Sequence, residues 1–208
     1  SVTNFLPNGT GLGGSATLAL VIIGSLYKLK GRPFNANTII KQAHHFETIK
    51  QGIKGGFQDY IGSYFGRLNY ITFPSLQSVD LTRTPTLGQK IPALLTNLLN
   101  ENMILIIKQT GNTSSGQIVA DEINNFQLKK RLQSLRLQTI KACNESIYSA
   151  ILADTSHDLQ WTNLIDESWQ AQKKLSQFVG NGLIGEIETK VKPLVKAIRG
   201  PGAGGNSL

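Results

Sequence analysis

The feature that most constrains this chain is a glycine-rich loop near its beginning. Residues 7–16 read PNGTGLGGSA and stand between a short β-prone run and an apolar helical segment. The four glycines, Gly9, Gly11, Gly13 and Gly14, permit backbone angles that other residues resist and let main-chain N–H groups approach an anion. The helix that follows begins with unpaired N–H groups, and its dipole favours negative charge there. The loop therefore predicts a site for nucleotide phosphates.

Two other glycine motifs fit this loop less well. The spacing Gly9-x-Gly11-x-x-Gly14 also satisfies the Rossmann dinucleotide fingerprint, but that motif needs a second strand ending in an acid about 20 residues on. No such strand follows, and the next acid, Glu47, lies inside a second predicted helix. The Gly-Lys-Ser/Thr ending of a Walker motif is also missing. For the loop taken alone, a glycine-rich turn without a ligand remains the alternative.

A second group of residues consists of Glu47 and the segment GIKGGFQD at 52–59. Together with the loop, it resembles the GHMP kinases, and within them the sugar-1-kinase branch that contains D-glycero-D-manno-heptose 7-phosphate kinase and fucokinase. Further segments resemble the same branch: ILIIKQTGNTSS at 104–115, ESW at 167–169 and RGPGAGG at 199–205. The chain departs from the family pattern at Arg67, Ser114, Arg199, Asn206 and Ser207. The resemblance covers nearly the whole chain.

The resemblance implies an α+β protein with the two-domain GHMP kinase fold. Residues 1–85 would be the remainder of the N-terminal ATP-binding domain, and residues 86–208 an incomplete C-terminal domain. Family members have strands before the loop and further elements after the last glycine motif, so we expect the N-terminal strands and the C-terminal end of the fold to be lacking. The residue pattern predicts strands at 2–5, 68–73, 103–108 and 194–198. It predicts helices at 15–30, 37–51, 59–65, 117–153 (whole or broken), 159–177 and 184–192.

The resemblance also implies roles for individual residues. Asp59 is similar to the catalytic aspartate, which accepts the proton of the acceptor hydroxyl or holds that hydroxyl in line. Ser15 and Glu47 would be the Mg²⁺ partners. The residues that would hold ATP are Pro7, Gly9, Thr10, Gly11, Leu12, Gly13, Gly14, Ser15, Gly202 and Gly204. The alternatives are that Asp59 is only a helix N-cap and that 202–205 is a flexible tail. The start of a helix is expected to keep Asp59 ionised.

The second predicted helix has an apolar face at helical spacing, and Gly52 is its natural stop. This face comprises Ile39, Ile40, Ala43, Phe46 and Ile49 or Lys50. A glutamate such as Glu47 beside an apolar face is unfavourable unless it is paired. The neighbouring residues His44 and His45 point to different sides of a helix, so they are interpreted as surface or packing residues and not as a metal pair.

Composition favours a soluble globular protein, because the 208 residues are 40% hydrophobic without an apolar run of membrane-spanning length. The single cysteine, Cys143, excludes an internal disulfide and suits the cytoplasm. The net charge of +8 suits ATP and a sugar phosphate. The basic run at 129–131 has no interleaved aromatic residues, which argues against nucleic acid. We expect a small-molecule sugar-phosphate substrate, no nucleic-acid or membrane partner, and a homodimer as a possible assembly.

The function that these observations predict is ATP-dependent phosphorylation of a sugar or sugar-phosphate hydroxyl, with the anomeric hydroxyl of a heptose 7-phosphate as the acceptor. Two alternatives stay open. One is a catalytically silent nucleotide-binding homologue or fragment that acts as a regulatory or interaction module. The other is a GHMP kinase of the fucokinase or mevalonate type.

Overall fold

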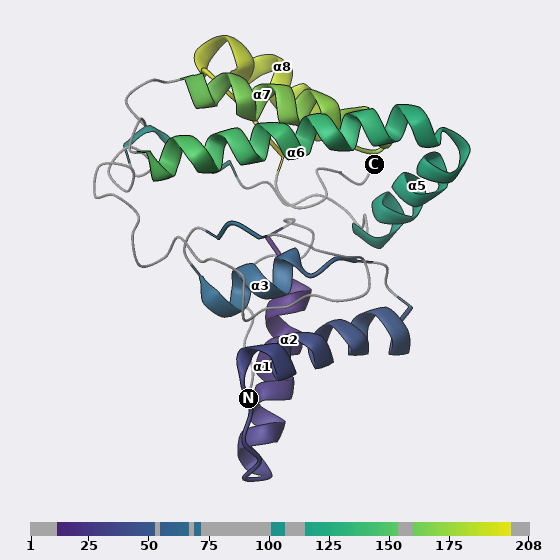
Figure 1. Cartoon of the computed structure of the whole chain (residues 1–208), viewed down its shortest axis with the longest axis vertical. Coiled ribbons are helices and arrows are strands. Elements are labelled where there is room, and N and C mark those ends of the chain that lie inside the picture. The colour runs from purple at the N-terminus through teal and green to yellow at the C-terminus, as the bar shows by residue number, and fades with distance from the viewer. Residues whose placement is uncertain are drawn as a thin grey trace. The chain divides into compact units, whose positions relative to one another are not determined.

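The structure is a computed structural model that describes residues 12–52, 55–66, 69–71, 101–106, 115–153 and 160–200 (Figure 1). The chain divides into two compact units, Ser1–Ile91 and Pro92–Leu208. The domain boundary predicted between residues 85 and 86 lies outside the described residues. In the described part of the chain, no helix is long and apolar enough to cross a bilayer.

Among its described residues, the first unit has three α-helices that pack around one apolar cluster. Helix α1 spans Gly14–Leu29, α2 spans Ala36–His45 and continues into the π-helical turn η1 at Phe46–Lys50, and α3 spans Gln58–Phe65. All three helices contact one another. The buried cluster comprises Ala16, Ala19, Leu20, Ile39, Ile40, Ala43, Tyr60 and Ile61. Its members recur at helical spacing on α1 and α2, so each helix buries one face.

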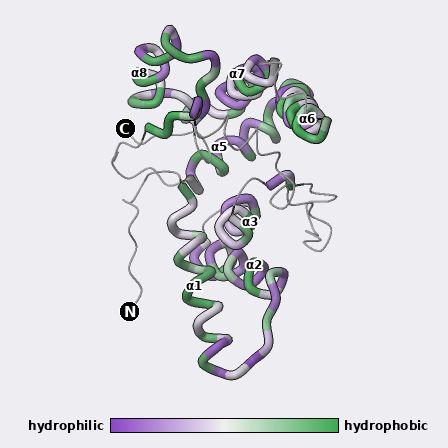
Figure 2. The backbone as a smooth tube through the Cα atoms, turned by 90° about the vertical axis from the view of Figure 1, so that its left-hand side faces the viewer, coloured by the Kyte–Doolittle hydropathy of each residue, from purple (hydrophilic) through white to green (hydrophobic). Residues whose placement is uncertain are grey.

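Helix ends in this unit follow from local chemistry. Asn35 stands in an extended conformation before α2, and its side-chain oxygen accepts a hydrogen bond from the N–H of Thr38 at 2.9 Å. Gly52 follows η1 with φ 72°, a left-handed conformation that favours glycine. Helix α1 is hydrophobic along most of its length (Figure 2), and its face away from the cluster stays exposed. That face comprises Leu18, Val21, Ile22, Leu26 and Leu29.

The second unit contains four α-helices in its described residues. They are α5 at Ser115–Leu128, α6 at Lys130–Leu152, α7 at Gln160–Lys173 and α8 at Gly182–Val191, which runs into the 3₁₀ turn η4 at Lys192–Leu194. Helices α6 and α7 lie side by side as a hairpin (Figure 1). The predicted helix at 117–153 is broken at Lys129, where the backbone leaves the helical region.

Trp169 is the centre of the second unit. Its side chain is fully buried and packs in a cluster with Ile118 and Val179. Its indole N–H donates to Oε2 of Glu188 at 3.0 Å, and the other oxygen of that carboxylate lies 2.6 Å from Nζ of Lys173. The ammonium group also lies 5.8 Å from the centre of the indole ring. A buried polar atom is therefore satisfied within an otherwise apolar core.

The prediction of an α+β fold is wrong for the residues that the structure describes. All regular elements among them are helical; residues 103–106 and 195–200 are irregular, and Asn69 forms only an isolated bridge. The strand predicted at 2–5 lies outside the described residues. A strand satisfies its N–H and C=O groups only by pairing with another strand. The apolar run at 103–106 is half or more exposed, and none of the described residues forms a strand that pairs with it.

Candidate active site

The start of α1 carries the described end of the glycine loop. Gly13 precedes the helix with φ 71° and ψ 25°, a left-handed conformation that favours glycine. The N–H and Oγ1 of Thr17 lie 2.9 and 3.0 Å from the carbonyl oxygen of Gly13, which closes the first turn. Ser15 is exposed in this turn, which is uncharged. The turn therefore presents backbone N–H groups and a free hydroxyl, as an anion site requires.

The predicted nucleotide-binding residues fall into two sets. Leu12, Gly13, Gly14 and Ser15 are described, and they lie together at the start of α1. The others lie outside the described residues: Pro7, Gly9, Thr10, Gly11, Gly202 and Gly204. The segment at 110–114, which the resemblance places near the sugar phosphate, is outside them as well.

Helix α3 brings Asp59 against the start of α1. A Cβ atom built on Gly13 would lie 3.4 Å from Cβ of Asp59 and 3.6 Å from its Cγ. The hydroxyl oxygens of Thr17 and Ser63, 2.8 Å apart, link the same two helices. The N-cap position of α3 is Phe57, so Asp59 is not its N-cap and lies in the first turn. Two segments 46 residues apart in sequence thus meet where the glycine loop becomes a helix.

A substitution at Gly13 tests the left-handed turn that begins α1. Gly13→Ala is expected to destabilise the first unit by about 1–2 kcal/mol, because alanine resists the left-handed conformation at this position. Gly24→Ala is the matched control. Gly24 lies within α1, and a Cβ atom added there would have no other atom within 4 Å. Because alanine favours the helix more than glycine does, Gly24→Ala should stabilise it by about 0.5–1 kcal/mol. Urea unfolding followed by circular dichroism measures the free energy of unfolding of both variants. Changes of the same sign in the two variants would contradict this account.

Glu47 is buried at the junction of α2 and η1. Its side chain is only 6% exposed, whereas Phe46 and Ile49 beside it are 46% and 66% exposed. The predicted apolar face therefore holds at Ile39, Ile40 and Ala43 but is wrong beyond them. The cause is the wider π turn, in which the N–H of Gln51 bonds to the carbonyl of Phe46, five residues back.

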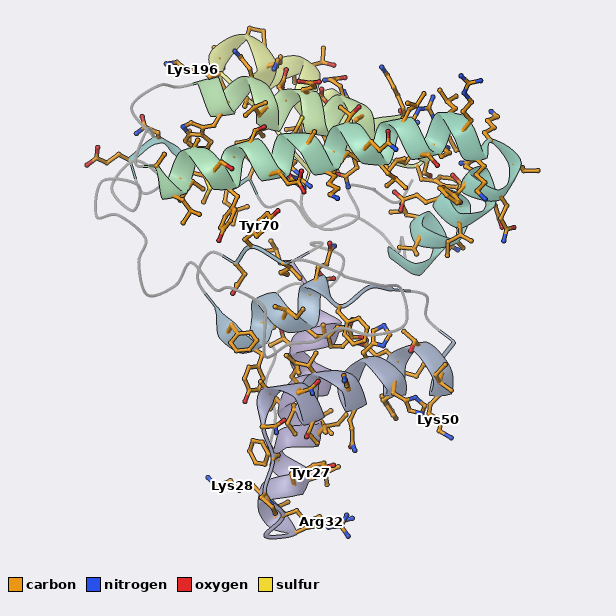
Figure 3. All side chains as sticks on the ribbon, in the orientation of Figure 1. Tyr27, Lys28, Arg32, Lys50, Tyr70 and Lys196 are labelled. Carbon is orange, nitrogen blue, oxygen red and sulfur yellow. The ribbon has the colours of Figure 1, made fainter. Side chains whose placement is uncertain are left out.

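A tyrosine supplies the pairing that buried Glu47 needs. The hydroxyl of Tyr60, on α3, donates a hydrogen bond to Oε2 of Glu47. Burial, followed by the hydrogen bond and the charge of Glu47, raises the pKa of Tyr60 far above its usual value, so the hydroxyl stays a donor. The position of Glu47 beside an apolar face indicated that it needs a partner, but no sequence pattern pointed to Tyr60. Lys50, at the end of η1, extends away from α3 (Figure 3).

The carboxyl group of Asp59 has a raised pKa. Burial is the larger cause, and the negative charge of Glu47 is the second. The helix start was expected to keep this group ionised, but burial and the like charge of Glu47 act against that effect and raise the pKa of Asp59. The charge of Glu47 thus disfavours the ionised form of Asp59. A carboxylate whose proton affinity is raised is better suited to accept a proton at neutral pH.

His44 holds the glycine turn that precedes α3. Its ring stacks on Phe57 with centroids 3.9 Å apart and planes at 18°, and it meets the ring of Tyr60 edge-on. Its Nε2 lies 3.1 Å from the carbonyl oxygen of Gly55. The interpretation of His44 as a packing residue fits these contacts, but its link to the turn beside Asp59 was missed. Nothing in the sequence spacing indicates such a link.

The described residues contain no group of three or more His, Cys, Asp or Glu side chains that could hold a metal by themselves. Mg²⁺ does not require one, since it is usually held by one or two carboxylates together with phosphates and water. Glu47 and Asp59 offer hard oxygen ligands of like charge, and a divalent cation would offset their repulsion. The donor chemistry thus fits Mg²⁺, with Ser15 as an exposed hydroxyl at the start of α1.

Comparison with known proteins identifies related kinases. The chain is 23% identical over 180 residues to D-glycero-alpha-D-manno-heptose 7-phosphate kinase of Campylobacter jejuni, covering 85% of this chain and 49% of that protein. It is 29% identical over 167 residues to mevalonate kinase of Thermococcus sibiricus, covering 79% of this chain and 44% of that protein. It is 23% identical over 205 residues to the bifunctional fucokinase/GDP-fucose pyrophosphorylase of Arabidopsis thaliana, covering 98% of this chain and 19% of that protein.

These alignments set the extent of the relationship. The chain spans about half the length of the first two relatives, or less. Residues 1–67 match the family model described as the GHMP kinases N terminal domain. That segment contains both Gly13 and the start of α3, which meet in the structure. The resemblance to the GHMP kinases seen in the sequence is thus confirmed.

Proposed function

We propose that this protein is an ATP-dependent kinase that transfers a phosphoryl group to a hydroxyl of a small sugar or sugar phosphate, with Mg²⁺ as the metal. The observation that carries the proposal is the placement of Asp59 against the start of α1. Phosphoryl transfer requires phosphates held in position next to a group that orients or deprotonates the attacking hydroxyl. The kinase relatives support the same reaction class.

The chain's own residues have distinct tasks in this proposal. The N–H groups at the start of α1, together with the glycine loop at Gly9–Gly14, bind the phosphates of ATP. Asp59 accepts the proton of the acceptor hydroxyl, and its raised pKa favours that transfer. Glu47 and Ser15 supply oxygen ligands to Mg²⁺. When bound, the metal neutralises charge on the transferred phosphoryl group.

For the acceptor, we propose the anomeric hydroxyl of a heptose 7-phosphate. The support is the sugar-1-kinase pattern of the motifs and the heptose 7-phosphate kinase among the relatives. Mevalonate and fucose are the competing acceptors, favoured by the other two relatives. A catalytically silent nucleotide-binding module is the alternative from a different class.

A coupled assay of ADP release tests the proposal. The purified chain is supplied with MgATP and, in separate reactions, D-glycero-D-manno-heptose 7-phosphate, fucose or mevalonate. We expect the heptose phosphate to give the highest kcat/KM. ATP binding without turnover of any acceptor would establish the silent module instead. Faster turnover of mevalonate or fucose would retain the kinase and refute the heptose assignment.

A further inference from the structure

The contact between Tyr60 and Glu47 is more than a means of burying a charge. Glu47 is 6% exposed and Tyr60 is 5% exposed, so water does not compete freely for either group. The tyrosine hydroxyl donates to one carboxylate oxygen, Oε2. A hydrogen bond to an ionised group in a poorly hydrated site is stronger than a neutral one and fixes the rotamer of the carboxylate.

The ring of Tyr60 is itself held in place. It belongs to the buried cluster of the first unit and meets the ring of His44 at 76°, with centroids 5.6 Å apart. His44 in turn stacks on Phe57. The hydroxyl is thus presented from a rigid side chain that directly follows Asp59 in α3. One short segment of α3 therefore carries the proposed base and the partner of the proposed metal ligand.

The π turn makes this support necessary. Glu47 lies in η1, where a five-residue hydrogen bond replaces the regular helical pattern and widens the backbone. A long, flexible side chain on such a turn needs an external partner to hold one orientation. Groups that hydrogen-bond a metal-ligating carboxylate orient it, and their loss commonly lowers metal affinity by about 10–100-fold.

We propose that Tyr60 is a positioning residue for the metal site: it holds Oε2 of Glu47 and leaves the other carboxylate oxygen to the divalent cation. This inference rests on the proposed function in that it takes Glu47 as a ligand of the metal that accompanies ATP. It adds a residue that the motifs do not assign. Tyr60 acts through Glu47 and does not touch the reacting groups.

The test compares Tyr60→Phe with Tyr64→Phe. Tyr64 lies on the same helix but is 39% exposed and contacts Phe65, so its variant controls for the chemical change. Binding of Mn²⁺ in the presence of ADP is measured from the electron paramagnetic resonance signal of the free ion, which requires no turnover. We expect Tyr60→Phe to weaken Mn²⁺ binding about tenfold and Tyr64→Phe to change it less than about twofold. Circular dichroism verifies that both variants are folded.

A double-variant cycle shows whether Tyr60 acts through Glu47. Glu47→Gln should weaken Mn²⁺ binding, and adding Tyr60→Phe to it should weaken binding little further. Additive losses would overturn the inference, as would unchanged Mn²⁺ binding in Tyr60→Phe or no Mn²⁺ binding by the unaltered protein with ADP. If Mn²⁺ binding responds as expected but no acceptor is phosphorylated, the positioning role stands and the kinase proposal fails.

Discussion

Asp59→Asn is expected to lower kcat by about 10³-fold while ATP affinity changes by less than about twofold, because the variant loses the proton acceptor and keeps the side-chain volume beside Gly13. The volume matters, since the side chain of Asp59 packs against the backbone that begins α1. Single-turnover rates and calorimetric titration with ATP measure the two quantities. A kcat within about tenfold of the unaltered protein would remove Asp59 from the proposed chemistry.

The same variant should be more stable than the unaltered protein at neutral pH in the absence of metal. Folding raises the pKa of Asp59 through burial and the charge of Glu47, so the folded chain binds this proton more tightly than the unfolded chain. Such a group lowers stability as the pH rises from its usual pKa through the raised one. The advantage of asparagine should therefore shrink as the pH falls below the usual pKa of aspartate.

Thermal unfolding between pH 3 and 8 in the presence of a chelator tests this pH dependence. Glu145→Gln is the matched control, because this carboxylate is 53% exposed and only forms a surface pair with Lys141. It should change neither the unfolding temperature nor kcat measurably. An unfolding temperature of Asp59→Asn below that of the unaltered protein at pH 7 would contradict the proposed repulsion between Asp59 and Glu47.

Sequence periodicity located the helices well because their local signals agree with their burial. The residues at the helix ends suit their positions: Gly13 before α1 and Gly52 after η1 have positive φ, and Asn35 caps the start of α2. The predicted hairpin partner at 159–177 corresponds to α7, which packs along α6. The break at Lys129 could not be placed, since the residues on both sides of it are good helix formers.

Strands were mispredicted because an apolar run does not specify its partner. Residues 103–106 have the composition of a core strand, yet their side chains are largely exposed and no described strand pairs with them. Residues 194–198 follow the end of α8 at Val191 and begin within the turn η4, and no described strand pairs with them. Strand formation depends on distant segments, whereas helices close their hydrogen bonds locally.

The residues of the candidate site could be predicted from the sequence, but the contacts that hold them in place could not. Motif resemblance pointed to Gly13, Glu47 and Asp59, and the structure places Gly13 in contact with Asp59. Regular helical spacing placed Phe46 on the apolar face of the helix. In the structure, the π turn buries Glu47 and leaves Phe46 exposed. The Tyr60 partner depends on the packing of α3 against α2, and no pairwise sequence spacing encodes that contact.

In the second unit, Trp169→Ala is expected to lower the free energy of unfolding by about 3–5 kcal/mol. The indole is fully buried among Ile118 and Val179, so its removal leaves a cavity. The substitution also removes the N–H donor to Glu188, which leaves that carboxylate with Lys173 and Gln170. Hydrogen exchange of the α6 and α7 amides, together with urea unfolding, measures the loss.

Two further variants separate the cavity from the lost hydrogen bond. Trp169→Phe keeps an apolar ring but loses the donor to Glu188. We therefore expect its free energy of unfolding to lie between those of Trp169→Ala and the unaltered protein. Leu194→Ala removes a side chain that is 82% exposed and should change stability by less than about 0.5 kcal/mol. Equal losses for Trp169→Ala and Trp169→Phe would show that the hydrogen bond, and not the filled volume, stabilises this core. A loss below about 1 kcal/mol for Trp169→Ala would mean that the indole is not the centre of the second unit.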